Sequence, residues 1–163
     1  MKTKYIIITK NVIMDNCSMP VNVKVKGVSE SSTRLNVSSG NFNMIIDEPK
    51  EMGGSNLGPT PIQVLLMALA GCLNVTAHEI AKQENLPLTS LSIEIDGKLD
   101  ACTFLGCSTE NRAGFDSINV QMNAEFSIPV AQNVIDNWIK ETETRCPVTD
   151  NIKSLTNISL SVN

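Results

Sequence analysis

The sequence predicts an α+β fold, in which antiparallel sheet packs against helices. Its candidate strands and helices fall into clusters along the chain, whereas a parallel α/β protein would alternate them regularly. Apolar residues make up 42% of the sequence and charged residues 18%, an ordinary balance for a globular protein. The length of 163 residues suits one domain, so we expect a single domain over residues 1–163.

The first third of the chain predicts β-structure. Its segments are short, rich in Val and Ile, and separated by turn-forming residues. The predicted strands are residues 4–9, 21–28, 34–37 and 42–46. Residues 1–20 are expected to form an N-terminal extension or an edge strand.

A long helix is predicted after a Gly- and Pro-rich loop. Thr60 is a suitable N-cap, Pro61 suits the first helical position, and Gln63 completes a capping box. No proline intervenes over residues 62–84, and Pro87 follows the expected end. Because the first half is almost wholly apolar, we expect this helix to be the buried centre of the fold.

The remainder of the chain predicts further strands and two helices. Residues 91–99 and 115–126 alternate with period 2, and residues between them resemble a loop. A helix is expected from Pro129 onward, a short helix over residues 147–153, and a closing strand over residues 158–162.

Charge and composition exclude several classes of partner. Lys and Arg number 13 against 17 Asp and Glu, for a net charge of −4, whereas nucleic-acid and acidic-membrane binders need a basic surface. The longest apolar stretch is shorter than the roughly 20 residues of a membrane span. Five cysteines, an odd number, do not suggest a secreted disulfide framework, and no secretory signal is recognisable. We therefore expect a cytoplasmic protein without nucleic-acid or membrane partners.

Two cysteines are candidates for reactive thiols. Cys72 lies mid-helix, where Leu65, Leu69 and Thr76 share its face, so it is either an inert buried residue or part of an apolar pocket floor. Cys146 lies at the expected start of the short helix, next to Arg145. The helix N-terminus and the Arg145 guanidinium both favour a thiolate at this position, although a chance cysteine in a turn fits the sequence equally well.

The two thiols would form a redox centre if the fold brought them together. One thiolate would attack an O–O bond and become a sulfenic acid, and the other would condense with it to a disulfide. Such a site needs a cation beside the attacking sulfur, and the chain's arginines are Arg34, Arg112 and Arg145.

Other motifs are weaker. Cys102 and Cys107 lack a nearby histidine, no CxxC pair exists, and a zinc site is not expected. Cys17 lies in a polar segment. His78 is predicted to point about 120° away from Cys72 on the helix, which argues against a Cys–His dyad.

Several motifs together resemble the family of osmotically inducible and organic hydroperoxide resistance proteins, OsmC/Ohr. The motifs are the segments 47–49, 53–54, 58–61, 65–73 and 97–99, Gly114-Phe115 and residues 145–148. The resemblance implies an intertwined α+β homodimer, in which antiparallel sheets wrap long central helices.

The resemblance also implies an activity. Members reduce organic and, in some branches, inorganic hydroperoxides by two cysteines, as part of the oxidative stress response. They bind no cofactor and take electrons from a dithiol such as dihydrolipoamide. Carried over, Cys72 is the peroxidatic thiol, Cys146 the resolving thiol and Arg34 the activating cation.

The start of the long helix departs from the family pattern. Peroxidase members typically carry a Glu ten residues before the cysteine, where this chain has Ile62, followed by neutral Gln63. Ile62, Gln63, Leu65 and Leu69 are the expected substrate-binding residues. The departure keeps a second hypothesis open: a non-catalytic dimeric protein that binds an apolar ligand beside Cys72. A metal-dependent hydrolase ranks below both.

Overall fold

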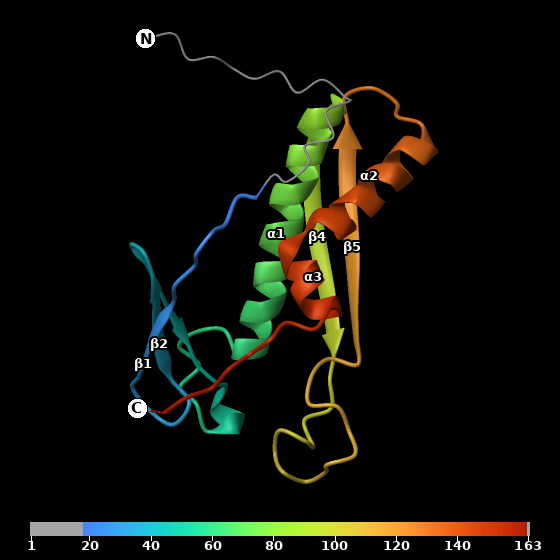
Figure 1. Cartoon of the computed structure of the whole chain (residues 1–163). Coiled ribbons are helices and arrows are strands. Elements are labelled where there is room, and N and C mark those ends of the chain that lie inside the picture. Colours follow the sequence, from blue (N-terminus) through green and yellow to red (C-terminus); the bar gives the residue numbers. More distant parts are fainter. Residues whose placement is uncertain (1–17, 163) are drawn as a thin grey trace, which may run out of the picture.

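The computed structural model describes residues 18–162 and confirms the α+β class (Figure 1). The elements in chain order are β1 Lys26–Ser29, β2 Leu35–Ser39, β3 Phe42–Ile46, the 3-10 helix η1 Lys50–Met52, α1 Pro61–Glu84, β4 Leu88–Lys98, β5 Ser117–Phe126, α2 Gln132–Arg145 and α3 Pro147–Lys153. The β1–β3 sheet lies to one side of α1, and α1, α2 and α3 pack near the β4–β5 hairpin.

Both sheets are antiparallel. The order β1-β2-β3 forms a meander, with Val37 of β2 opposite Met44 of β3. The strands β4 and β5 form a long hairpin in which Ile93 faces Met122. The β1–β3 strands are joined by short turn-rich connections, whereas the longer loop of residues 99–116 joins β4 to β5.

The start of α1 follows the local prediction. The Thr60 hydroxyl accepts the Gln63 N–H at 3.3 Å, and Gln63 Oε1 accepts the Thr60 N–H at 2.9 Å, so the capping box is complete. The helix ends at Asn85, whose φ of 56° places it in the left-handed region. This cap stops α1 before β4 begins.

The core consists of two small clusters along α1. One contains Leu69 and Leu73 with Cys146, and the other contains Ala77 and Ile80 with Trp138 of α2. Nε1 of the buried Trp138 donates to the Ala77 carbonyl oxygen at 2.9 Å. This bond satisfies the indole N–H and fixes α2 against α1.

The loop before α1 is held by one buried carboxylate. Asp47 accepts the Thr33 hydroxyl and the N–H groups of Glu48, Ser55 and Leu57. Burial acts to raise the pKa of Asp47, but these hydrogen bonds outweigh it and hold the pKa below its usual value. The carboxylate therefore anchors the segment that sets the start of α1.

The structure corrects several predicted elements. Residues 158–162 form no strand. Of the predicted strand 21–28, only residues 26–28 belong to a strand, β1, because no described strand lies beside the rest. The second helix begins at Gln132 rather than at Pro129. The predicted strand 4–9 lies outside the described residues.

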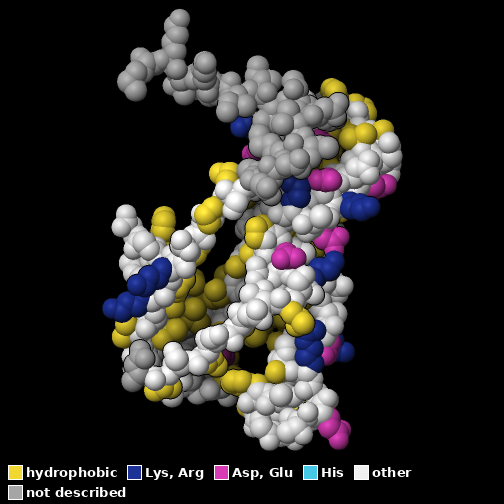
Figure 2. Space-filling model, viewed as in Figure 1, with side chains coloured by type: hydrophobic (Ala, Val, Ile, Leu, Met, Phe, Trp, Pro, Cys, Tyr) yellow, Lys and Arg dark blue, Asp and Glu magenta, His cyan; other side chains and the backbone are white. Residues whose placement is uncertain are grey.

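The expectation that α1 is the buried centre of the fold holds for one face of the helix only. One face is buried, whereas Met67 and Val75 are 57% and 68% exposed. By length and composition, α1 is also apolar enough to cross a membrane, as core helices of folded proteins can be. Figure 2 shows further hydrophobic side chains beside the hollow between the β1–β3 sheet and the helices.

Candidate active site

Cys72 lies near the middle of α1, beside the buried face of the helix. Its neighbour Leu73 and Leu69, one turn earlier, are buried. Cys72 itself is partly exposed and packs against the cluster that contains Cys146. The helix therefore presents this thiol at the margin of the core.

Cys146 occupies the junction between α2 and α3. It ends α2 and caps α3, with φ −80° and ψ 112°, and Pro147 takes the first position of α3. Its Sγ accepts the Thr149 N–H at 3.4 Å, and the residue is 1% exposed. The predicted N-cap position of Cys146 is thus confirmed.

The fold brings Cys72 and Cys146 together. Both belong to one packed cluster, and each thiol shifts the pKa of the other. Both are free thiols in the structure. Two cysteines far apart in the sequence therefore form one coupled dithiol.

The two thiols differ in acidity. Burial acts to raise the pKa of Cys146, but the polar groups of Thr149, the Cys72 thiol and the Val148 N–H outweigh it and lower the pKa. For Cys72, burial is the largest influence and the neighbouring Cys146 adds to it, so its pKa is raised. Cys146 is therefore the more acidic of the two thiols.

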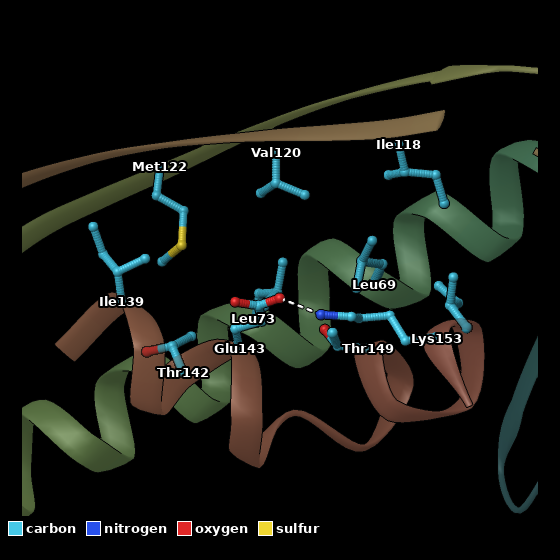
Figure 3. Close-up of a pocket in the computed structure, with 11 residues that line it drawn as sticks. Leu69, Leu73, Ile118, Val120, Met122, Ile139, Thr142, Glu143, Thr149 and Lys153 are labelled. Carbon is cyan, nitrogen blue, oxygen red and sulfur yellow. Dashed lines mark hydrogen bonds and ion pairs between the residues drawn. The ribbon is translucent and has the colours of Figure 1, made fainter. Parts of the chain in front are cut away.

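An apolar cavity of about 380 Å³ opens next to this dithiol (Figure 3). Leu69 and Leu73 belong to both the cavity wall and the cluster around Cys146. The whole lining comprises Leu69, Leu73, Ile118, Val120, Met122, Ile139, Thr142, Glu143, Thr149, Ile152 and Lys153. The volume is in the range of small-molecule sites.

Polar groups mark one side of the cavity. Glu143 of α2 and Lys153 of α3 form an ion pair at 2.6 Å, drawn as a dashed line in Figure 3. The hydroxyl oxygen of Thr149 is buried and has no hydrogen-bond partner of ordinary geometry among residues 18–162. Thr149 thus links the cavity wall to the Cys146 sulfur.

The predicted substrate-binding residues are distributed unevenly. Leu69 lines the cavity, whereas Ile62, Gln63 and Leu65 do not. The Gln63 side chain is held by the capping box, and Ile62 and Leu65 are each 38% exposed. These three residues lie nearer the start of α1, where one protomer forms no described pocket.

The arginines predicted to activate the thiol, Arg34 and Arg145, pair with glutamates rather than with the two cysteines. Nε of Arg34 pairs with Glu30 at 2.8 Å, near the turn between β1 and β2. Arg145 directly precedes Cys146 in the chain, but its Nη1 lies 3.9 Å from Oε2 of Glu141. Within the described chain, neither arginine is among the groups that shift the pKa of the two thiols.

Sequence reasoning missed Thr149 and the β5 side of the cavity. A signal existed for both: an N-cap side chain contacts the residue three positions on, and Ile118, Val120 and Met122 alternate along one strand face. The contribution of the Glu143–Lys153 pair could not be predicted, because it requires the packing of α2 against α3.

The other candidates lie apart from the dithiol. His78 is exposed on α1, and Cys102 and Cys107 lie in the loop between β4 and β5. Cys17 falls outside the described residues. Over residues 18–162, no group of three His, Cys, Asp or Glu side chains is placed to hold a metal ion.

Fold and site together define an α+β protein with a coupled dithiol beside an apolar cavity. The sequence profile of OsmC-like proteins matches residues 53–161, and the chain belongs to this family. A comparison with curated protein sequences found no match.

Solved structures agree with the family. An OsmC-like protein from Mycoplasma pneumoniae has a TM-score of 0.71 at 21% identity, covering 84% of this chain and 91% of its own. An organic hydroperoxide resistance protein from Legionella pneumophila has a TM-score of 0.60 at 18% identity, covering 83% and 92%. Another of that name, from Elizabethkingia anophelis with thiocyanate bound, has a TM-score of 0.56 at 14% identity, covering 82% and 89%. At these identities the likeness shows the fold.

Proposed function

We propose that this protein is a thiol-dependent peroxidase that reduces organic hydroperoxides, with Cys72 as the peroxidatic and Cys146 as the resolving thiol. The observation that supports it most is the coupled dithiol itself, formed from distant parts of the chain. The names of related structures as organic hydroperoxide resistance proteins point the same way.

Access divides the roles between the two sulfurs. Cys146 is almost fully buried, whereas Cys72 is partly exposed and open to a substrate. When the hydroperoxide binds, the Cys72 thiol loses its proton to solvent. The Cys72 thiolate then attacks the O–O bond, yielding Cys72 sulfenic acid and an alkoxide that takes a proton from solvent and leaves as the alcohol.

The second step closes the disulfide. The Cys146 thiol attacks the Cys72 sulfenic sulfur, forms the S–S bond and releases one water. An external dithiol, such as dihydrolipoamide, reduces the disulfide by exchange and leaves as its own disulfide. One hydroperoxide and one dithiol are thus consumed per turnover, and no bound cofactor is required.

The apolar cavity supplies a place for the alkyl part of the substrate. Its walls are Leu, Ile, Val and Met side chains, with polar groups only at Thr142, Thr149 and the ion pair. Such a lining favours a hydroperoxide with an apolar tail over hydrogen peroxide.

We further propose that the working form is a cytoplasmic homodimer. The exposed apolar face of α1 and the extended segments at both ends of the described chain would be covered by a second copy. Val23 is 80% exposed and Leu160 94% exposed, and both lie in segments that alternate like strands. A second copy is also the means by which Arg34 would approach Cys72.

The experiment is turnover of cumene hydroperoxide with dihydrolipoamide as reductant. We expect the wild type to consume hydroperoxide and Cys72→Ser to be inactive. Cys146→Ser should support one oxidation and then stop or turn over slowly. A wild type no faster than Cys72→Ser would refute the peroxidase.

The cavity also favours a second function, the binding of an apolar ligand without catalysis. Ile62 at the position of the family's Glu supports this alternative. Lipid retained in native mass spectra, together with thiols that do not react with hydroperoxide, would select it.

A further inference from the structure

The loop between β4 and β5 contains a second pair of cysteines in a defined turn. Leu105 N–H donates to the Ala101 carbonyl at 2.9 Å, which closes one helical turn. Gly106 N–H then donates to Thr103 at 3.1 Å, and Cys107 N–H donates to Cys102 at 2.8 Å. With Gly106 at φ 73°, these nested bonds are a Schellman motif.

This motif determines which side chains meet. The residues at its two ends, here Cys102 and Cys107, occupy the positions whose side chains commonly contact each other. Their backbones are joined directly by the hydrogen bond from the Cys107 N–H to the Cys102 carbonyl oxygen, and a disulfide joins residues whose backbones lie this near each other. The turn therefore places the two cysteines side by side in the loop.

Side-chain hydrogen bonds within the loop also hold this turn in place. Asp100 accepts the Cys102 N–H at 2.8 Å and the Asn111 side-chain amide at 2.9 Å. The Thr103 hydroxyl donates to the Asn111 carbonyl at 2.8 Å. These bonds make the proximity of the two cysteines a feature of the folded loop rather than of a flexible segment.

We propose that Cys102 and Cys107 form a second, separate redox-active dithiol, which closes a disulfide within the loop by exchange with a small disulfide. Cys107 is exposed and Cys102 is partly buried. The loop lies beyond the end of the hairpin, and neither residue belongs to the cluster around Cys146 (Figure 1). The pair is therefore accessible to a small molecule independently of the candidate active site.

Exchange proceeds in two steps with a set order. The exposed Cys107 thiolate attacks one sulfur of the small disulfide, forms a mixed disulfide and releases the first thiolate. Cys102 then loses its proton to solvent, attacks the Cys107 sulfur and releases the second thiolate, so the loop is oxidised and the small disulfide reduced. Cys102 acts second because the Asp100 carboxylate beside it raises the pKa of its thiol.

The test is a redox titration of the full chain, as wild type and as Cys72→Ser/Cys146→Ser. The protein is equilibrated with mixtures of glutathione and glutathione disulfide, quenched with acid, alkylated and digested with trypsin. Cleavage after Lys98 and Arg112 yields one peptide that contains Cys102 and Cys107 and no other cysteine.

We expect this peptide to lose two hydrogens and carry no alkyl group as the glutathione disulfide fraction rises, equally in both proteins. A peptide that stays fully alkylated, or that carries glutathione at every ratio, would overturn the proposal. So would crosslinking of this peptide to a second chain in place of the internal bond.

Two variants report on the geometry. Cys102→Ser should stop the reaction at the Cys107–glutathione mixed disulfide. Gly106→Ala places a side chain in the left-handed region, so closing should need a roughly tenfold more oxidising mixture. An unchanged titration of Gly106→Ala would contradict the role of the turn. The mass of this peptide reports on Cys102 and Cys107 alone. A negative result here is therefore distinguishable from a negative result in the hydroperoxide assay.

Discussion

The two cysteine pairs of this protein are built in opposite ways. Cys72 and Cys146 come from distant segments and meet only because α1, α2 and α3 pack together. Cys102 and Cys107 meet through the hydrogen bonds of a single turn. The first pair thus depends on tertiary packing, which also supplies burial and a cavity, whereas the second depends on local backbone geometry and remains open to solvent.

This difference determines the chemistry that suits each pair. The pair formed by Cys72 and Cys146 lies beside an apolar cavity, which suits the proposed reduction of an apolar hydroperoxide. Cys102 and Cys107 have no apolar cavity beside them among the described residues. Because exposed disulfides exchange readily, this pair suits thiol–disulfide exchange. Each of the following experiments separates the two pairs.

The largest difference is expected in hydroperoxide turnover. Cys72→Ser should lower kcat/KM for cumene hydroperoxide by about a thousandfold or more, because the attacking sulfur is lost. Cys102→Ser should leave it within about twofold, since the loop is outside the proposed site. Steady-state assays with dihydrolipoamide measure both, and equal losses would show that the pairs are not independent.

Thiol accessibility is the next largest effect. Under native conditions Cys107 should react with iodoacetamide at least about a hundredfold faster than Cys146, which becomes accessible only through local opening. Timed alkylation followed by peptide mass mapping measures both rates. In urea the difference should vanish; a rapid native reaction of Cys146 would show that its burial is transient.

These contrasts also show how far the sequence could predict the molecule. The start of α1 was predictable because the capping box of Thr60 and Gln63 is local. The segment 158–162 has the alternation of a strand but no partner strand among residues 18–162, and a strand exists only where another pairs with it.

In the candidate site, too, the local features were predictable and those that depend on tertiary packing were not. The N-cap role of Cys146 was predictable from Pro147, whereas its meeting with Cys72 needed the packing of three helices. The Schellman turn is local, yet its signal is one glycine in a loop. Only the observed hydrogen bonds show that Gly106 brings Cys102 and Cys107 together.

The carboxylate beside Cys102 predicts a smaller change. Asp100→Asn removes a negative charge that raises the pKa of this thiol, so the pKa should fall. The alkylation rate of Cys102 at pH 8 should then rise by roughly threefold to tenfold, following its thiolate fraction. Asp116→Asn, in the same loop, is the matched control and should leave the rate unchanged. Slower alkylation in Asp100→Asn would mean that the carboxylate assists ionisation.

The smallest effect concerns Thr149 and the pH dependence of the buried pair. The polar groups of Thr149 help to lower the pKa of Cys146, so Thr149→Val should raise that pKa while the backbone N–H stays in place. A thiol with a lowered pKa keeps its negative charge to a lower pH than a free thiol does, and loses that charge as the pH falls through its pKa. The acidic limb of the turnover profile should therefore move to higher pH in the variant.

Stability provides the control for this last prediction. The Thr149 hydroxyl is buried without an ordinary hydrogen-bond partner, so replacing it with a methyl group should leave the free energy of unfolding unchanged or raise it by up to about 1 kcal/mol. Thr144→Val is the matched control, because Thr144 is exposed on α2 and does not line the cavity. This variant should leave the pH profile unchanged. A displaced acidic limb without loss of stability would assign to Thr149 an electrostatic role at Cys146. An unmoved limb would leave the ionisation of Cys146 to backbone N–H groups and Cys72.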